Sequence, residues 1–132
     1  MLELVAGLEG ELTQTVTKEL TAAAYGSGLV AAFATPVMIG LMEGASVEAI
    51  KRALAPGQTS VGIEVNIKHL AATPVGMQVR ARSKVIGVEG RRVTFQVEAW
   101  DDKEKIGEGT HTRMIMDDAK FRERFEQKMK AM

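Results

Sequence analysis

Cysteine is absent from this chain of 132 residues. Its absence excludes a disulfide framework, a thiolate nucleophile and a zinc site built on cysteine. Because the chain also has only two histidines, no tight metal site is expected. A chain without disulfides suits a reducing compartment, and we predict a cytoplasmic protein.

Net charge and long apolar runs are missing as well. The chain has 17 basic and 17 acidic residues, so no overall field draws it to nucleic acid or to a membrane. The N-terminus lacks the positive region and apolar run of a signal peptide. The apolar stretch at 29–42 is interrupted by Thr35, Pro36 and Gly40 and is too short to span a bilayer. We predict one domain over residues 1–132.

The clearest predicted element is a helix from Thr35 to about Ala55. Thr35 is a natural N-cap and Pro36 suits the first helical position, while Pro56-Gly57 ends the pattern. The helix is apolar on several sides. We therefore expect a sheet to bury it, since a surface helix needs a polar face.

Strands are predicted both before and after this helix in the sequence. A Thr-rich alternation favours a strand over 11–17, and residues 21–34, rich in Ala and Gly, favour a short helical turn or a mobile segment. A meander of four further strands follows the helix, and its tight turns favour antiparallel pairing; the predicted ranges are 58–70, 76–88, 92–101 and 105–116.

Together these elements predict an α+β fold in which a curved antiparallel sheet of about five strands wraps one long central helix. In the strand over 58–70, the odd-numbered row from Val61 to Ile67 is predicted to face that helix. A last helix is predicted over 118–131, with an apolar stripe of Phe121, Phe125 and Met129. Such a sheet has free edges, and edge pairing with a second copy removes one of them.

Glu43 is the most informative residue for function. Its helical neighbours at spacings of three and four include Ile39 and Val47, so a carboxylate lies within an apolar row. Such a carboxylate is costly unless it is paired or functional. The Glu43 side chain either points to the edge of the apolar row and is satisfied by a hydrogen-bond donor, or it belongs to a functional site.

His69 ends the strand row that is predicted to face the helix. It is either a half-buried core histidine or a general base with a pKa near working pH. The hydroxyl of Thr35 is explained by the predicted helix cap alone, although a hydroxyl at a helix N-terminus also suits oxyanion stabilisation. We interpret His111 as a hydrogen-bonded strand residue, and Arg113 as a paired charge or a contact for a ligand phosphate.

Several other enzyme signatures are missing. The sequence contains no GxSxG elbow, Walker loop, GxGxxG fingerprint or HExxH pair.

Four segments carry a resemblance to a known family. They are the run from Ala34 to Glu43, Gly57-Gln58-Thr59-Ser60-Val61-Gly62, Lys68-His69-Leu70-Ala71-Ala72-Thr73-Pro74, and Gly107 to Arg113. This pattern resembles the hotdog-fold thioesterases of the fluoroacetyl-CoA thioesterase type, over about residues 11–116.

The resemblance implies a hotdog homodimer, or a dimer of dimers, that hydrolyses a small or medium acyl-CoA at sites between subunits. It assigns catalytic roles to Thr35, Glu43 and His69 and substrate binding to Gly62 and Arg113. It implies no cofactor, since coenzyme A is part of the substrate. The specialised family member carries aromatic lid residues where this sequence has Tyr25-Gly26-Ser27-Gly28-Leu29, so the acyl group is not predicted.

The central spatial prediction is that Glu43 and His69 converge on one pocket, within a protomer or across two. Other functions on the same fold are a non-catalytic acyl-CoA sensor or carrier, a structural dimerisation domain and a hydratase.

Overall fold

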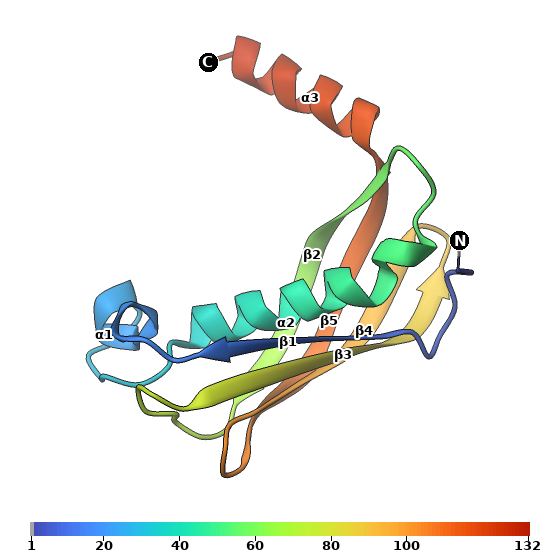
Figure 1. Ribbon diagram of the computed structural model, residues 1–132. Coiled ribbons are helices and arrows are strands. Elements are labelled where there is room, and N and C mark those ends of the chain that lie inside the picture. Colours follow the sequence, from blue (N-terminus) through green and yellow to red (C-terminus); the bar gives the residue numbers. More distant parts are fainter. Residues whose placement is uncertain (1) are drawn as a thin grey trace.

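The computed structural model describes residues 2–132 and contains one antiparallel sheet of five strands in the order β1-β3-β4-β5-β2. The sheet curves around the long helix α2 (Thr35–Ile50), as predicted (Figure 1). The strands are β1 (Glu9–Thr15), β2 (Gln58–His69), β3 (Gln78–Glu89), β4 (Arg92–Trp100) and β5 (Lys105–Asp117).

Short helices accompany α2, and α3 (Asp118–Lys130) extends away from the sheet beyond the end of β5 (Figure 1). Its predicted stripe is largely exposed at Phe125 and Met129. No helix within residues 2–132 has the length and apolar character needed to cross a bilayer. The short elements are η1 (Lys18–Leu20), α1 (Ala22–Tyr25) and η2 (Lys51–Ala53).

The start of α2 differs from the prediction. Ala34, in an extended conformation, is the N-cap; Thr35 is the first helical residue, and no side chain caps the helix. The backbone N–H of Ala34 donates to the carbonyl of Leu20, so contacts with the preceding segment fix where the helix begins. The Thr35 hydroxyl is therefore available to another partner.

One face of α2 is buried against the sheet, as the apolar character of the helix predicts. Gly10 on β1 permits this close packing, because a Cβ there would collide with the backbone of Ala45 and Ala49. Val47, on another face, remains 39% exposed. The buried residues of α2 are Met38, Met42, Ala45, Ser46, Ala49 and Ile50.

Two of the inner strands, β3 and β4, each present one row of side chains to the core. Strand alternation points them at α2, and none of them is more than 1% exposed. These residues are Val79, Ala81, Ser83 and Val85 of β3 and Val93, Phe95, Val97 and Ala99 of β4.

Strand β2 lies at the sheet edge, paired only with β5, and is irregular. A bulge between Gly62 and Glu64 shifts its register. After the bulge, Val65 pairs with the buried His111 and so faces the concave side, as predicted. Before it, Gly62 pairs with Arg113 and takes the inward position predicted for Val61. The prediction for the odd-numbered row is thus wrong at Val61.

The outer part of this concave face is poorly covered. Helix α2 packs mainly against β1 and β3, which leaves Ile63 47% and Val65 46% exposed. Two apolar side chains on a free edge strand are an unusual surface for an isolated protomer.

Candidate active site

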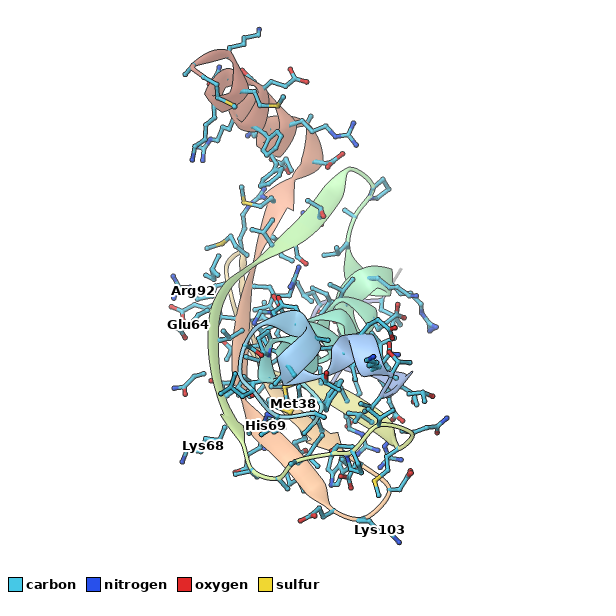
Figure 2. The ribbon with its side chains drawn as sticks, turned by 90° about the vertical axis from the view of Figure 1, so that its left-hand side faces the viewer. Met38, Glu64, Lys68, His69, Arg92 and Lys103 are labelled. Carbon is cyan, nitrogen blue, oxygen red and sulfur yellow. The ribbon has the colours of Figure 1, made fainter. Side chains whose placement is uncertain are left out.

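Thr35 and His69 are joined by a hydrogen bond. Thr35 Oγ1 lies 2.7 Å from His69 Nδ1. Thr35 comes from the first turn of α2 and His69 from the last position of β2, so the bond ties the helix start to the end of the edge strand. His69 points inward toward Met38, whereas Glu64 and Lys68 on the same strand point away (Figure 2).

His69 is held as a neutral imidazole near pH 7. Burial lowers its pKa below the ordinary value of 6.5, and the nearby backbone of Ala71 opposes the shift only in part. Its Nε2 atom is buried, and no residue within 2–132 forms a hydrogen bond with it. A neutral imidazole with one uncommitted nitrogen suits a general base.

Both residues line a cavity of about 420 Å³. Its wall is made of small and apolar side chains from α1, the segment before α2 and the segment after β2. This lining suits an aliphatic group next to the polar Thr35–His69 pair. The other lining residues are Ala22, Ser27, Gly28, Val30, Ala32, Phe33, Leu70, Ala71 and Ala72.

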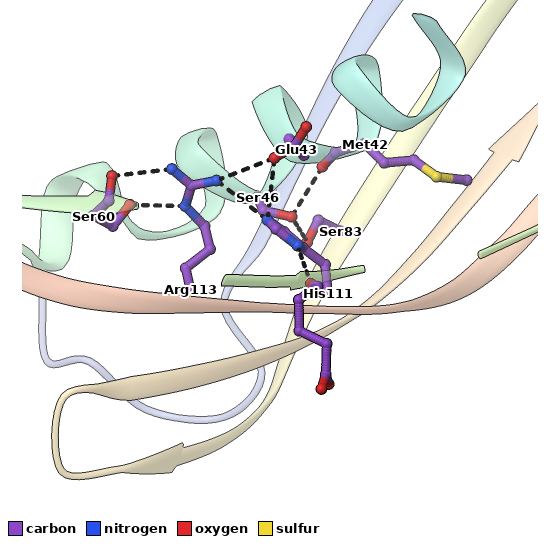
Figure 3. A network of polar contacts seen from close by, with 8 residues as sticks. Met42, Glu43, Ser46, Ser60, Ser83, His111 and Arg113 are labelled. Atoms are coloured by element: carbon purple, nitrogen blue, oxygen red, sulfur yellow. Dashed lines mark hydrogen bonds and ion pairs between the residues drawn. The ribbon is translucent and has the colours of Figure 1, made fainter. Parts of the chain in front are cut away.

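Glu43 belongs to a second group of polar residues (Figure 3). Its Oε2 atom lies 4.0 Å from Arg113 Nη1 and 4.0 Å from His111 Nε2. Arg113 is held by Ser60, since its Nε donates to the hydroxyl at 2.8 Å and its Nη2 to the carbonyl at 3.0 Å. A guanidinium fixed in this way places a positive charge beside a partly exposed carboxylate.

Gly62 provides the open space in front of this group. A Cβ there would lie 3.0 Å from Glu43 Oε2, 3.1 Å from His111 Cε1 and 3.4 Å from Arg113 Nη1. A side chain would therefore crowd the carboxylate. The space continues into a cavity of about 200 Å³ lined by Glu43, Gly62, Ile63, Glu64, Val65 and His111.

Within one protomer the two groups remain separate. Thr35 and Glu43 are eight residues apart on α2, which corresponds to roughly 12 Å along the helix axis. No hydrogen bond or ion pair between described residues joins Glu43 to Thr35 or His69, and the two groups line different cavities. The sequence predicted that Glu43 and His69 converge on one pocket, either within a protomer or across two. Within a single protomer they line different cavities.

His111 was interpreted as a strand residue, and its hydrogen bond to the Glu64 carbonyl agrees with that interpretation. Sequence reasoning missed its place beside Glu43. The available signal was its spacing of two from Arg113, which puts both on one face of β5. Among residues 2–132 no three potential ligands cluster in a way that could hold a metal ion.

Comparisons with known proteins agree with the predicted family. A sequence profile described as fluoroacetyl-CoA-specific thioesterase matches residues 16–119. The fluoroacetyl-CoA thioesterase of Streptantibioticus cattleyicolor is 42% identical over 99 residues, which cover 75% of this chain and 71% of that protein.

Solved structures agree in fold. A single-residue variant of a fluoroacetyl-CoA-specific thioesterase, in complex with fluoroacetate and CoA, has a TM-score of 0.82 and 34% identity over 88% of this chain and 98% of that one. A thioesterase superfamily member from Thermus thermophilus has a TM-score of 0.89 and 31% identity over all of both chains.

The curved sheet, the central helix and these similarities define a hotdog-fold thioesterase. The chain belongs to the family of fluoroacetyl-CoA-specific thioesterases. The predictions of a hotdog fold and of a thioester hydrolase are thereby confirmed at the level of the family.

Proposed function

We propose that this protein hydrolyses a small or medium acyl-CoA thioester in a site shared by two protomers. Thr35 and His69 come from one protomer, and Glu43, Gly62 and Arg113 come from its partner. The observation that carries this proposal is His69, a neutral imidazole beside an apolar cavity, with a buried nitrogen that forms no hydrogen bond with any described residue.

The free edge of β2 supports the shared site. Gly62 and His69 both lie on this strand, seven residues apart, and Ile63 and Val65 between them are exposed apolar residues. Antiparallel pairing of two β2 edges about a two-fold axis covers these side chains. It also brings the Gly62 region of one protomer toward the His69 end of the other.

Each residue then has a chemical role. His69 takes the proton from the attacking water and returns it to the departing CoA sulfur, so the products are the free acid and the CoA thiol. Thr35 keeps the imidazole ring oriented through its 2.7 Å bond. Glu43 either aligns the water or attacks the carbonyl to form an anhydride that water then cleaves. Backbone N–H groups at Gly62 or at the start of α2 stabilise the oxyanion.

Arg113 is assigned to substrate binding through its effect on the pocket. Its guanidinium is anchored by Ser60 and lies at the edge of the space left by Gly62. A positive charge at that position stabilises the negative charge that develops on a thioester oxygen.

Of the proposed acyl-CoA substrate, the acyl group is the part that the structure constrains least. Relatives are named for fluoroacetyl-CoA. Here Ser27, Gly28 and Val30 line the cavity beside Thr35 and His69, with no aromatic ring other than Phe33 in its wall. We therefore include acyl groups larger than fluoroacetyl among the candidate substrates.

A second candidate is a non-catalytic acyl-CoA sensor or carrier on the same fold. The partly exposed Glu43 beside Arg113 is compatible with this function, since such a pair can bind a ligand without turnover. Thiol release from acetyl-, fluoroacetyl- and longer acyl-CoA esters separates the two functions.

In this assay we expect steady thiol release by the wild type and a loss of at least about a hundredfold in kcat for Glu43→Gln and for His69→Ala. Melting temperatures close to that of the wild type would show that both variants fold. Binding of the esters without thiol release would support the sensor, and wild-type turnover by either variant would remove the role assigned to that residue.

A further inference from the structure

The geometry of His111 fixes which of its nitrogens carries a proton. Its Nδ1 lies 2.8 Å from the carbonyl oxygen of Glu64, which can only accept, so Nδ1 donates. Its Nε2 lies 3.2 Å from Arg113 Nη1, which can only donate, so Nε2 accepts. Only the neutral tautomer that carries its proton on Nδ1 satisfies both bonds.

The surroundings of His111 favour that neutral state. The side chain is 1% exposed, and the ring stacks on Phe95 of β4 with centroids 6.0 Å apart. The charged groups that face it are Arg113 on its own strand and Glu43 on α2. Burial lowers its pKa below 6.5 and Arg113 lowers it further; the Glu64 backbone bond and Glu43 oppose the shift without reversing it.

Each of the two bonds acts on a different part of the site. The bond to Glu64 holds the bulge after Gly62, and this bulge turns Gly62 toward Glu43. The bond from Arg113 holds Nη1 between the imidazole and the carboxylate. Without that acceptor, Nη1 is free to move onto Glu43 and to bind the carboxylate more closely.

We propose that His111 is a positioning residue for thioester hydrolysis: it keeps the Gly62 bulge in place and holds Arg113 at a distance from Glu43. This inference rests on the proposed function, since it assumes that Glu43 acts on the substrate. His111 itself touches no substrate atom in this account.

Three substitutions separate positioning from packing. His111→Phe keeps the aromatic ring on Phe95 and removes both nitrogens. His111→Asn keeps a donor near the position of Nδ1, and His111→Gln keeps an acceptor near the position of Nε2. We expect His111→Phe to lower kcat at least about tenfold with KM within about twofold, because a misplaced catalytic group slows chemistry more than binding. Asn and Gln should each recover part of this loss.

A kcat for folded His111→Phe within twofold of the wild type would overturn the proposal. If that variant does not fold, the other two replace it: wild-type kcat in both Asn and Gln overturns the proposal, and a clear loss in both supports it.

Nitrogen NMR of the wild type gives a readout that does not depend on turnover. The chain has two histidines, and His69→Gln identifies the signals of each. We expect His111 to show the tautomer protonated on Nδ1 and to stay neutral below pH 6.5. The tautomer protonated on Nε2 would overturn the proposal. If the protein hydrolyses no thioester, the proposed function fails, whereas the NMR result still tests the tautomer.

Discussion

Thr35 Oγ1 lies 2.7 Å from His69 Nδ1, whereas the other predicted catalytic residue, Glu43, lies eight residues, or about two helical turns, further along α2. The Thr35 hydroxyl is free for this bond because Ala34, rather than Thr35, is the N-cap of α2. Within one protomer these candidate residues thus form two separate groups, and the following predictions test whether the groups act together.

Thr35→Val should lower kcat about tenfold or more, because the imidazole loses the bond that orients its ring. Thr35→Ser keeps a hydroxyl and is the matched control, with kcat expected within a few-fold of the wild type. The melting temperature should change little in either variant, since Thr35 is exposed and forms no cap. A loss of about 1 kcal/mol in stability would instead be expected from removing an N-cap. Such a loss, together with unchanged kcat, would return Thr35 to a structural role.

Gly62→Ala should impair hydrolysis while the protein stays folded. The new Cβ would lie 3.0 Å from Glu43 Oε2 and 3.1 Å from the buried His111, so it would occupy the space assigned to the thioester carbonyl. Gly87→Ala on β3 is the control, because nothing lies within 4 Å of its added Cβ. Steady-state kinetics should show a clear drop in kcat/KM for Gly62→Ala only. Equal activity of the two variants would argue against a substrate at Gly62.

Stability should fall as the pH drops below about 6.5. Burial lowers the pKa of both His69 and His111, so the unfolded chain binds these two protons at a higher pH than the folded chain does. The stability that the two neutral histidines contribute is therefore fully present above pH 6.5. It is lost as the pH falls through their lowered pKa values in the folded protein. The carboxyls with lowered pKa, Glu19, Asp101 and Glu108, titrate only at more acidic pH.

Thermal melts between pH 7.5 and 5 measure this loss. A double variant with His69→Gln and His111→Gln should show a flatter profile over the same interval. An identical slope in the wild type and the double variant would mean that the two histidines are not the titrating groups.

The assembly of two copies should depend on the edge of β2. Val65→Lys places a charge on the exposed edge strand, where two copies are proposed to pair, and we expect it to shift the protein toward monomers and to abolish turnover. Ile86→Lys is the matched control: Ile86 is 49% exposed and lies on β3, which is paired on both sides. Light scattering coupled to size exclusion gives the mass of each. A dimeric and fully active Val65→Lys would contradict edge pairing at β2.

Much of the fold could be predicted because local chemistry determines it. Alternating residues identified β3, β4 and β5, and Pro56-Gly57 marked the end of the helical region. The bulge at Gly62 could not be predicted, since it depends on how β2 registers with β5, nearly 50 residues away along the chain. The cap at Ala34 was missed for a similar reason: Thr35 satisfies the local pattern, but a backbone bond to Leu20 fixes the helix start.

The candidate site was predicted residue by residue but not in its arrangement. Thr35, Glu43 and His69 follow from the family pattern, whereas their division into two groups required coordinates. The position of His111 beside Glu43 was also missed, because its spacing of two from Arg113 predicts a shared strand face but not which side chain of α2 lies opposite.

Subunit complementation tests the shared site most directly. Glu43→Gln and His69→Ala are each expected to be inactive alone. When they are mixed and allowed to exchange subunits, half of the dimers are mixed, and each mixed dimer carries both substitutions in one site and none in the other. The account predicts recovery of about one quarter of wild-type thiol release. If each site were built within one protomer, every site would keep one substitution, and the exchanged mixture would stay inactive.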